Sequence, residues 1–183
     1  MKYKIVTSGT SKVVSLAEIS QNLKPSSEIY ELSDKEVYLG LISHQTLVLF
    51  ATEFADYALK NYAKKENPEA EACIRLTRKW LEDRESVSNE ELRAAADAAY
   101  AAADDAAAYA AAYAANAAYA AANAANAANA AAYAAAYDTA NANANAANAN
   151  AAYAAGKNKN QEYERQGTFI LDFLKTGNHL FSM

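Results

Sequence analysis

Apolar side chains recur at steps of three and four residues along residues 37–64, which is the pattern of an amphipathic helix. The positions that carry this pattern are Leu41, Leu47, Phe50, Phe54, Tyr57, Ala58 and Tyr62. One or two helices are therefore predicted here, ended by Asn67, because Pro68 suits the first turn of a new helix. A second apolar stripe then predicts a helix as far as about Arg84, and its members are Ala70, Cys73, Ile74, Thr77, Trp80 and Leu81.

Residues 94–155, which we call the alanine block, replace large apolar residues by alanine punctuated with Tyr, Asn and Asp. From Arg93 to Thr168 the chain contains no Leu, Ile, Val, Phe, Met or Trp. The punctuating residues between positions 93 and 137 recur at a mean step of about 3.7 residues, close to the helical period. Alanine has the highest helix propensity and loses no side-chain entropy on burial, so the block is predicted to be helical.

One straight helix over the alanine block would be about 90 Å long, against a diameter of about 40 Å for a compact domain of this size. We therefore expect the block to fold back on itself as a bundle of helices. Asp and Thr are favourable N-caps, so the predicted breaks are Asp104-Asp105 and Asp138-Thr139. Gly156 is predicted to end the last helix of the block as its C′ residue.

The two ends of the chain differ in composition from the alanine block. Residues 1–36 combine a short β-like run, Tyr3–Val6, with Ser, Thr and Gly, and we treat them as an irregular N-terminal segment of uncertain structure. Ser33 is the predicted N-cap of a helical domain that spans residues 37–176. Its last helix, residues 162–175, regains large apolar residues and is expected to cover one end of the bundle, before a tail at residues 177–183. The predicted fold class is all-α, a bundle of alanine-rich helices folded back on one another.

Negative charge is concentrated in the alanine block. Of a formal net charge of −5, the block carries Asp97, Asp104, Asp105 and Asp138 with no Lys or Arg. Phosphate backbones are bound by Lys and Arg, so nucleic acid is not a predicted partner, whereas a basic protein is. An alanine or tyrosine face shared between subunits would also allow a homo-oligomer. No membrane association is predicted, because Asn and Asp recur along the block and are costly in lipid. A single cysteine, Cys73, excludes an intramolecular disulfide and favours the cytoplasm.

Few residues are candidates for catalysis or metal binding. His44 and His179 are the histidines of the chain, and neither has the spacing of a metal-ligand pair or a catalytic pair. Cys73 lies on an apolar stripe, where a small buried hydrophobe is expected rather than a nucleophile. Adjacent Asp residues such as Asp104 and Asp105 project about 100° apart on a helix, which favours helix capping over a metal cluster. We therefore predict a protein that is not an enzyme, with no catalytic residue, cofactor or metal.

Tyrosine and asparagine side chains are the distinctive feature of the alanine block. Two packing interpretations are open: either alanine faces pack helix on helix while Tyr and Asn face outward, or the tyrosines supply the core's large side chains. Tyr and Asn also offer flat apolar faces and adaptable hydrogen bonds, a mixture that is enriched in binding surfaces. The predicted partner-binding residues are Asp97, Asp104, Asp105, Tyr109, Tyr113 and Tyr119.

Several pieces occur in a fixed order between Val37 and Lys175. They are LVLFATEFADYALKNY, NPEAEACIRLTRKW, the alanine block, YDTANANANAANANAAYAA within it, and EYERQ before an apolar closing helix. In this order the chain resembles the alanine-rich immunity-protein family of bacterial polymorphic toxin systems. The resemblance implies a small all-α protein that neutralises a co-encoded toxin by binding it. The chain departs from the family where relatives carry Gly soon after the Trp, and at Asn141 and Asn145, where relatives carry His.

Two other functional classes stay open from the sequence. A phage protein of this kind would blunt a host defence, either by binding a defence protein or by sequestering a nucleotide signal between tyrosines. The nucleotide would need Lys or Arg from outside the alanine block. A structural or ice-binding helix is the third class, but ice-binding surfaces repeat Thr in register, and this block has only Thr139.

Overall fold

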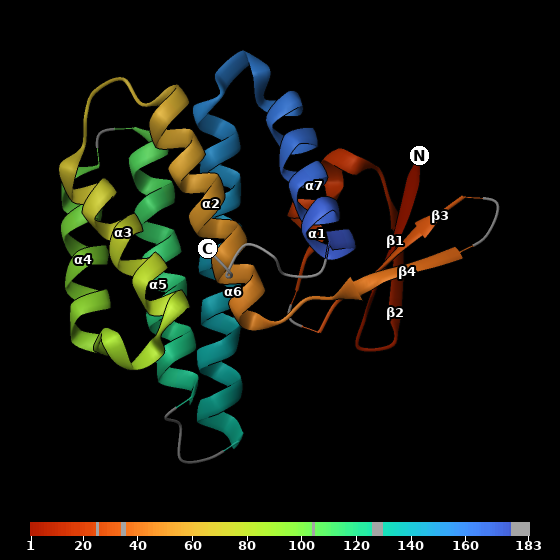
Figure 1. The fold of residues 1–183 in the computed structure, drawn as a ribbon, viewed down its shortest axis with the longest axis horizontal. Helices are drawn as coiled ribbons and strands as arrows, with labels where there is room; N and C mark the ends of the chain where they lie inside the picture. Colours follow the sequence, from red (N-terminus) through yellow and green to blue (C-terminus); the bar gives the residue numbers. More distant parts are fainter. Residues whose placement is uncertain (25, 34–35, 104, 126–129, 177–183) are drawn as a thin grey trace.

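The structure, a computed structural model, describes residues 1–24, 26–33, 36–103, 105–125 and 130–176. At residues 121, 123–125, 130–138 and 141 it describes the backbone alone. An antiparallel sheet lies at one side of a group of helices, and helix α7 (Lys159–Thr176) lies between the sheet and the remaining long helices (Figure 1). The chain is mostly helical, as predicted, but the sheet corrects the all-α class.

The N-terminal part of the chain, predicted to be irregular, forms the four-stranded sheet and two short helices. The strands are β1 (Lys2–Thr7), β2 (Thr10–Val14), β3 (Glu28–Leu32) and β4 (Glu36–Leu41), in the spatial order β2-β1-β3-β4. A two-residue turn joins β1 to β2, with Ser8 at φ 49° and Gly9 at φ 78°, as tight hairpins require. Short helices η1 (Leu16–Glu18) and α1 (Ile19–Asn22) connect β2 to β3.

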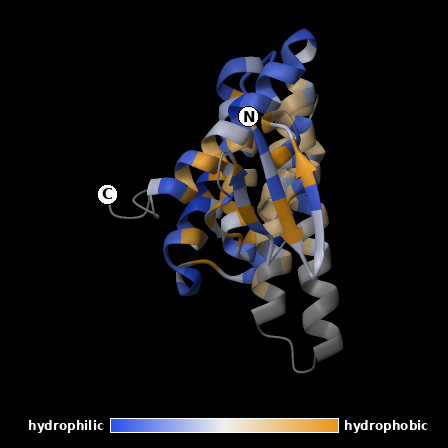
Figure 2. Ribbon diagram, turned by 90° about the vertical axis from the view of Figure 1, so that its right-hand side faces the viewer, coloured by the Kyte–Doolittle hydropathy of each residue, from blue (hydrophilic) through white to orange (hydrophobic). Residues whose placement is uncertain are grey.

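Alternating side chains explain why this segment forms a sheet. Tyr3 and Ile5 of β1 are buried, and Ile5 lies opposite the buried Ile29 of β3. Figure 2 shows hydrophilic and hydrophobic residues alternating along the strands that face the viewer. Such alternation is typical of an antiparallel sheet with one face on the core and one in solvent.

The first long helix begins later than predicted. Val37 pairs with Glu31 of β3, so residues 37–41 belong to β4, which crosses the boundary predicted at residue 36. Helix α2 (His44–Tyr62) starts after Ser43, whose hydroxyl accepts a hydrogen bond from the Thr46 amide. The predicted cap at Ser33 is therefore wrong. Apolar residues at 37 and 41 fit a helical period, but the available strand partner in β3 decides the outcome.

Of the remaining helices, α3 and α4 lie close to their predicted positions, whereas the division of the alanine block differs in part. The remaining helices are α3 (Pro68–Glu82), η2 (Arg84–Ser86), α4 (Asn89–Ala102), α5 (Ala106–Ala125), α6 (Ala130–Ala154) and η3 (Gly156–Asn158). The break predicted at Asp104-Asp105 is confirmed between α4 and α5, and Gly156 follows α6 with φ 55°. The break predicted at Asp138-Thr139 is wrong, because α6 runs through both residues. Asp and Thr lower helix propensity only modestly, so they permit a helix start without imposing one.

Alanine faces carry the packing between the helices of the block. Along α5 and α6 the buried alanines include Ala110, Ala111, Ala114, Ala117, Ala118, Ala144, Ala147 and Ala151. Tyr109, Tyr113 and Tyr119 are only half-buried, and Tyr100 and Tyr153 are exposed. Among the residues whose side chains are described, alanine supplies most of the helix contacts, as in the first packing interpretation, but Tyr113 and Tyr119 also pack against the core and Asn148 is buried. Small side chains let helix axes approach closely, and they lose no rotamer entropy in doing so.

Larger side chains anchor α7 to α2. Phe50 of α2 contacts Phe173 of α7 edge to face, with ring centroids 5.2 Å apart. The Glu162 carboxylate is completely buried and accepts two hydrogen bonds from Arg165, at 2.9 and 2.6 Å. The Arg165 guanidinium also lies 3.6 Å from the ring centroid of Tyr57 on α2. Such a paired and stacked charge orients the helix against its neighbour.

Gly167 marks a close approach between α7 and η1. A Cβ atom at this position would lie 2.2 Å from the carbonyl oxygen of Leu16, which is backbone and cannot rotate away. Gly167→Ala should therefore destabilise the protein by about 1–3 kcal/mol, although alanine gains about 1 kcal/mol of helix propensity over glycine. Urea unfolding measures the change, with the exposed Thr168→Ala as the control. A stabilised Gly167→Ala variant would show that α7 and η1 do not meet in this way.

Candidate functional site

Three tyrosines meet on the surface where α4 joins α5. The ring of Tyr100 on α4 lies 5.2 Å from that of Tyr109 and 6.2 Å from that of Tyr113, measured between centroids. Both contacts are edge to face, the arrangement that aromatic quadrupoles favour. Tyr109 and Tyr113 are one turn apart on α5, so they share a face of that helix. We call Tyr100, Tyr109 and Tyr113 the tyrosine cluster.

One member of the tyrosine cluster packs against the core, and another is exposed to solvent. Tyr113 packs partly against the main core. The pKa of its hydroxyl is raised, mainly by burial and to a lesser extent by the nearby Tyr100. Tyr100 is 49% exposed. A tyrosine fixed at its base and exposed at its edge presents apolar area at low entropic cost on binding.

Asp105 holds the α4–α5 connection in place. One carboxylate oxygen accepts hydrogen bonds from the amides of Ala107 and Ala108, at 3.0 and 3.1 Å. The other oxygen accepts from the amide of Lys64 at 3.0 Å, which ties the start of α5 to the segment after α2. The predicted capping role is therefore confirmed, and both oxygens have partners inside the chain. Asp105 is better placed to position the tyrosine cluster than to contact a partner directly.

Asp97 is the described acidic residue of the block that is most open to solvent. It lies on α4, three residues before Tyr100, and Arg93 approaches its carboxylate to 3.8 Å. Both side chains are about two-thirds exposed, and exposed pairs of this kind contribute little. The charge of Asp97 is thus available beside the cluster, with Arg93 as a nearby competitor.

The structure brings together only part of the predicted partner-binding set. Tyr119 is half-buried against the main core, six residues beyond Tyr113 and therefore on a different side of α5. Asp104 lies outside the described residues. Tyr100, absent from the predicted set, is central to the cluster. Once Asp105 is taken as a break, folding α4 back on α5 places Tyr100 opposite Tyr109, and this signal was present in the sequence.

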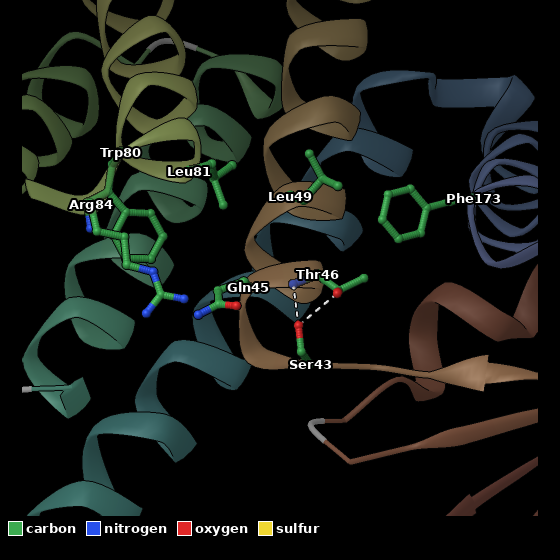
Figure 3. Close-up of a pocket in the computed structure, with 8 residues that line it drawn as sticks. All are labelled: Ser43, Gln45, Thr46, Leu49, Trp80, Leu81, Arg84 and Phe173. Carbon is green, nitrogen blue, oxygen red and sulfur yellow. Dashed lines mark hydrogen bonds between the residues drawn. The ribbon is translucent and has the colours of Figure 1, made fainter. Parts of the chain in front are cut away.

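Separately from the tyrosine cluster, a cavity lies at the start of α2. It has a volume of about 250 Å³ and is lined by Ser43, Gln45, Thr46, Leu49, Trp80, Leu81, Arg84 and Phe173 (Figure 3). Trp80 is 2% exposed, and the Arg84 guanidinium lies 5.9 Å from its ring centroid. Figure 3 shows the Arg84 guanidinium directed toward Gln45. Trp80 thus forms part of the cavity wall, but its ring is almost fully covered by neighbouring residues.

Cys73, His44 and His179 are the candidates for acid–base or nucleophilic chemistry. Cys73 is buried, its thiol lies 3.5 Å from the carbonyl of Ala111, and burial raises its pKa to about 12. Such a thiol is not ionised at neutral pH and is a poor nucleophile. His44 lies in the first turn of α2, and His179 lies outside the described residues. Within the described ranges, no group of three His, Cys, Asp or Glu side chains is arranged to hold a metal ion.

Comparison with known proteins identified no relative of this chain. No family model, no curated protein and no solved structure matches the chain. Among the described residues, none of the helices has the length and apolar character needed to span a membrane. The tyrosine cluster and its surroundings therefore have to be interpreted from their own chemistry.

Proposed function

We propose that this protein is a non-catalytic binding protein that neutralises a basic toxin or effector protein by direct association. The tyrosine cluster at the α4–α5 junction, in which Tyr100 is exposed and Tyr109 and Tyr113 are half-buried, is the observation that carries the proposal. The family resemblance described above points in the same direction, because it implies toxin neutralisation by binding.

Aromatic residues with a polar edge are the usual energetic anchors of protein interfaces. Tyrosine is enriched among the residues whose truncation costs the most binding energy. Tyr100 contacts the rings of both Tyr109 and Tyr113, so the three side chains provide a patch that a partner can cover, and their hydroxyls can hydrogen-bond at its rim. The patch is also presented rigidly, since closely packed alanine helices support it, and a rigid patch loses less entropy on binding.

The sign of the charge around this patch favours a basic partner. The alanine block contains four Asp and no Lys or Arg, and the exposed Asp97 stands three residues from Tyr100. Effectors that attack nucleic acid are basic because they must hold phosphate. Complementary charge would speed their encounter with this surface, and the tyrosines would retain them.

Co-expression tests the proposal. Each basic protein encoded beside the gene for this chain is produced with and without the chain, and cell growth is measured. We expect one of them to be toxic and the chain to restore growth. The variant Tyr100→Ala/Tyr109→Ala should lose this protection, whereas Tyr153→Ala, an exposed tyrosine on α6, should keep it. Full protection by a folded double variant, or no toxic neighbour that the chain binds, would contradict the proposal.

A further inference from the structure

A hollow of about 380 Å³ is lined by residues of the first two strands and of the segment after them. These strands lie on the other side of the molecule from α4 and α5 (Figure 1). The walls of the hollow come from β1, β2, α1 and the segment that follows α1. Lys12 of β2 lies opposite the buried Ile5 of β1, so the two side chains share one face of the sheet, with Lys12 exposed at its edge strand. Lys24, which follows α1, also lines the hollow.

The lining of this hollow combines apolar surface, which includes Ile5, with polar side chains, and its charged residues are both lysines. Besides the two lysines it contains Thr7, Thr10, Ser11 and Asn22, and no carboxylate lines it. Residues 1–24 carry four lysines against one acidic residue, Glu18, in a chain whose net charge is −5. The carboxylate of Glu18 accepts hydrogen bonds from the amide and hydroxyl of Ser15, at 2.8 and 2.7 Å. Within the sheet, β1 and β2 therefore carry the lysines, whereas β3 and β4 carry Glu28, Glu31 and Glu36.

The two lysines retain donors for a ligand. The Lys12 ammonium donates one hydrogen bond to Asn22, at 2.5 Å, which leaves two N–H donors. No carboxylate of the described ranges pairs with Lys24, whose side chain is exposed. Its backbone is held by Ser27, because the Lys24 amide donates to the Ser27 hydroxyl and the Ser27 amide donates to the Lys24 carbonyl, both at 3.0 Å.

We propose that this hollow binds the phosphate group of a small phosphorylated molecule. Lysine is a common phosphate ligand, because its ammonium acts as a compact charge with several donors. Two lysines facing one hollow suit a multiply charged anion, and the hydroxyl groups beside them supply neutral donors. No aromatic ring lines the hollow, so the contact is made to phosphate and not to a stacked base. This site is separate from the tyrosine cluster and does not depend on the function proposed for it.

Calorimetric titration with inorganic pyrophosphate tests this site on the full chain. We expect saturable binding that weakens as salt is raised. Lys12→Gln/Lys24→Gln should weaken binding at least tenfold, and Lys24→Gln alone, which removes no hydrogen bond within the described chain, should weaken it severalfold. Lys64→Gln/Lys157→Gln removes the same charge from two exposed positions away from the hollow, and should bind as the parent does.

Three results would overturn the assignment. One is the lack of saturable pyrophosphate binding by the folded parent. Another is equal binding by the parent and the folded Lys24→Gln variant. The third is an equal loss in Lys64→Gln/Lys157→Gln, which would mean that net charge alone controls binding. A single-stranded oligonucleotide that binds more tightly than pyrophosphate and depends on Lys12 and Lys24 would reassign the hollow to nucleic acid.

Discussion

Replacing Tyr100 and Tyr109 together by alanine should raise the dissociation rate of the partner complex by about thirtyfold or more. Truncation of a central tyrosine in an interface costs about 2 kcal/mol or more, which corresponds to that factor in affinity. Most such losses appear in the dissociation rate, because the encounter depends on long-range charge. Surface plasmon resonance with the immobilised partner measures both rates, on variants whose circular dichroism and melting temperature match the parent.

Variants that change charge at the same surface distinguish effects on the association rate from effects on the dissociation rate. Asp97→Lys should slow association, with an effect that shrinks as salt is added, and should change dissociation little. Asp105 is unsuitable for this purpose, because it caps α5 and bonds Lys64, so its loss would disturb the fold. Tyr153→Ala is the matched control for the tyrosine change. Unchanged dissociation in Tyr100→Ala/Tyr109→Ala would move the interface away from the tyrosine cluster.

Changing Trp80 to alanine should destabilise the protein by about 3–5 kcal/mol, since a large buried ring would leave a cavity. The side chain is 2% exposed and belongs to the main core cluster with Ile74, Leu47 and Leu92. Urea unfolding monitored by far-ultraviolet circular dichroism measures the loss, as Trp80 is the tryptophan of this chain and its fluorescence disappears with it.

Arg84→Ala is the matched control for Trp80. It removes the guanidinium that lies over the ring and leaves the ring in place, so it should cost only about 0.5–1 kcal/mol. If Trp80→Ala altered partner binding without lowering the unfolding free energy, the tryptophan would be a contact residue and not a packing anchor.

Local features of the sequence determined the helices and several of their ends. The starts of α3 and α4 follow from side-chain caps, and the structure shows Asn67 and Ser88 accepting hydrogen bonds from the amides of Ala70 and Glu91. Such caps act within one turn, so residue order alone is enough to predict them. The helicity of the alanine block likewise rests on a propensity that each residue carries by itself.

Contacts between distant residues decided the rest of the fold and both candidate sites. Residues 37–41 became a strand because β3 offered hydrogen-bonding partners, and α6 continued through Asp138 and Thr139. Tyr100 joined Tyr109 and Tyr113 only because α4 folds back on α5, and Lys12 and Lys24 came to line one hollow only through the packing of β2 and α1. Capping and propensity depend on neighbours within a few residues, whereas strand pairing and surface clusters depend on which distant segments the packed core brings together.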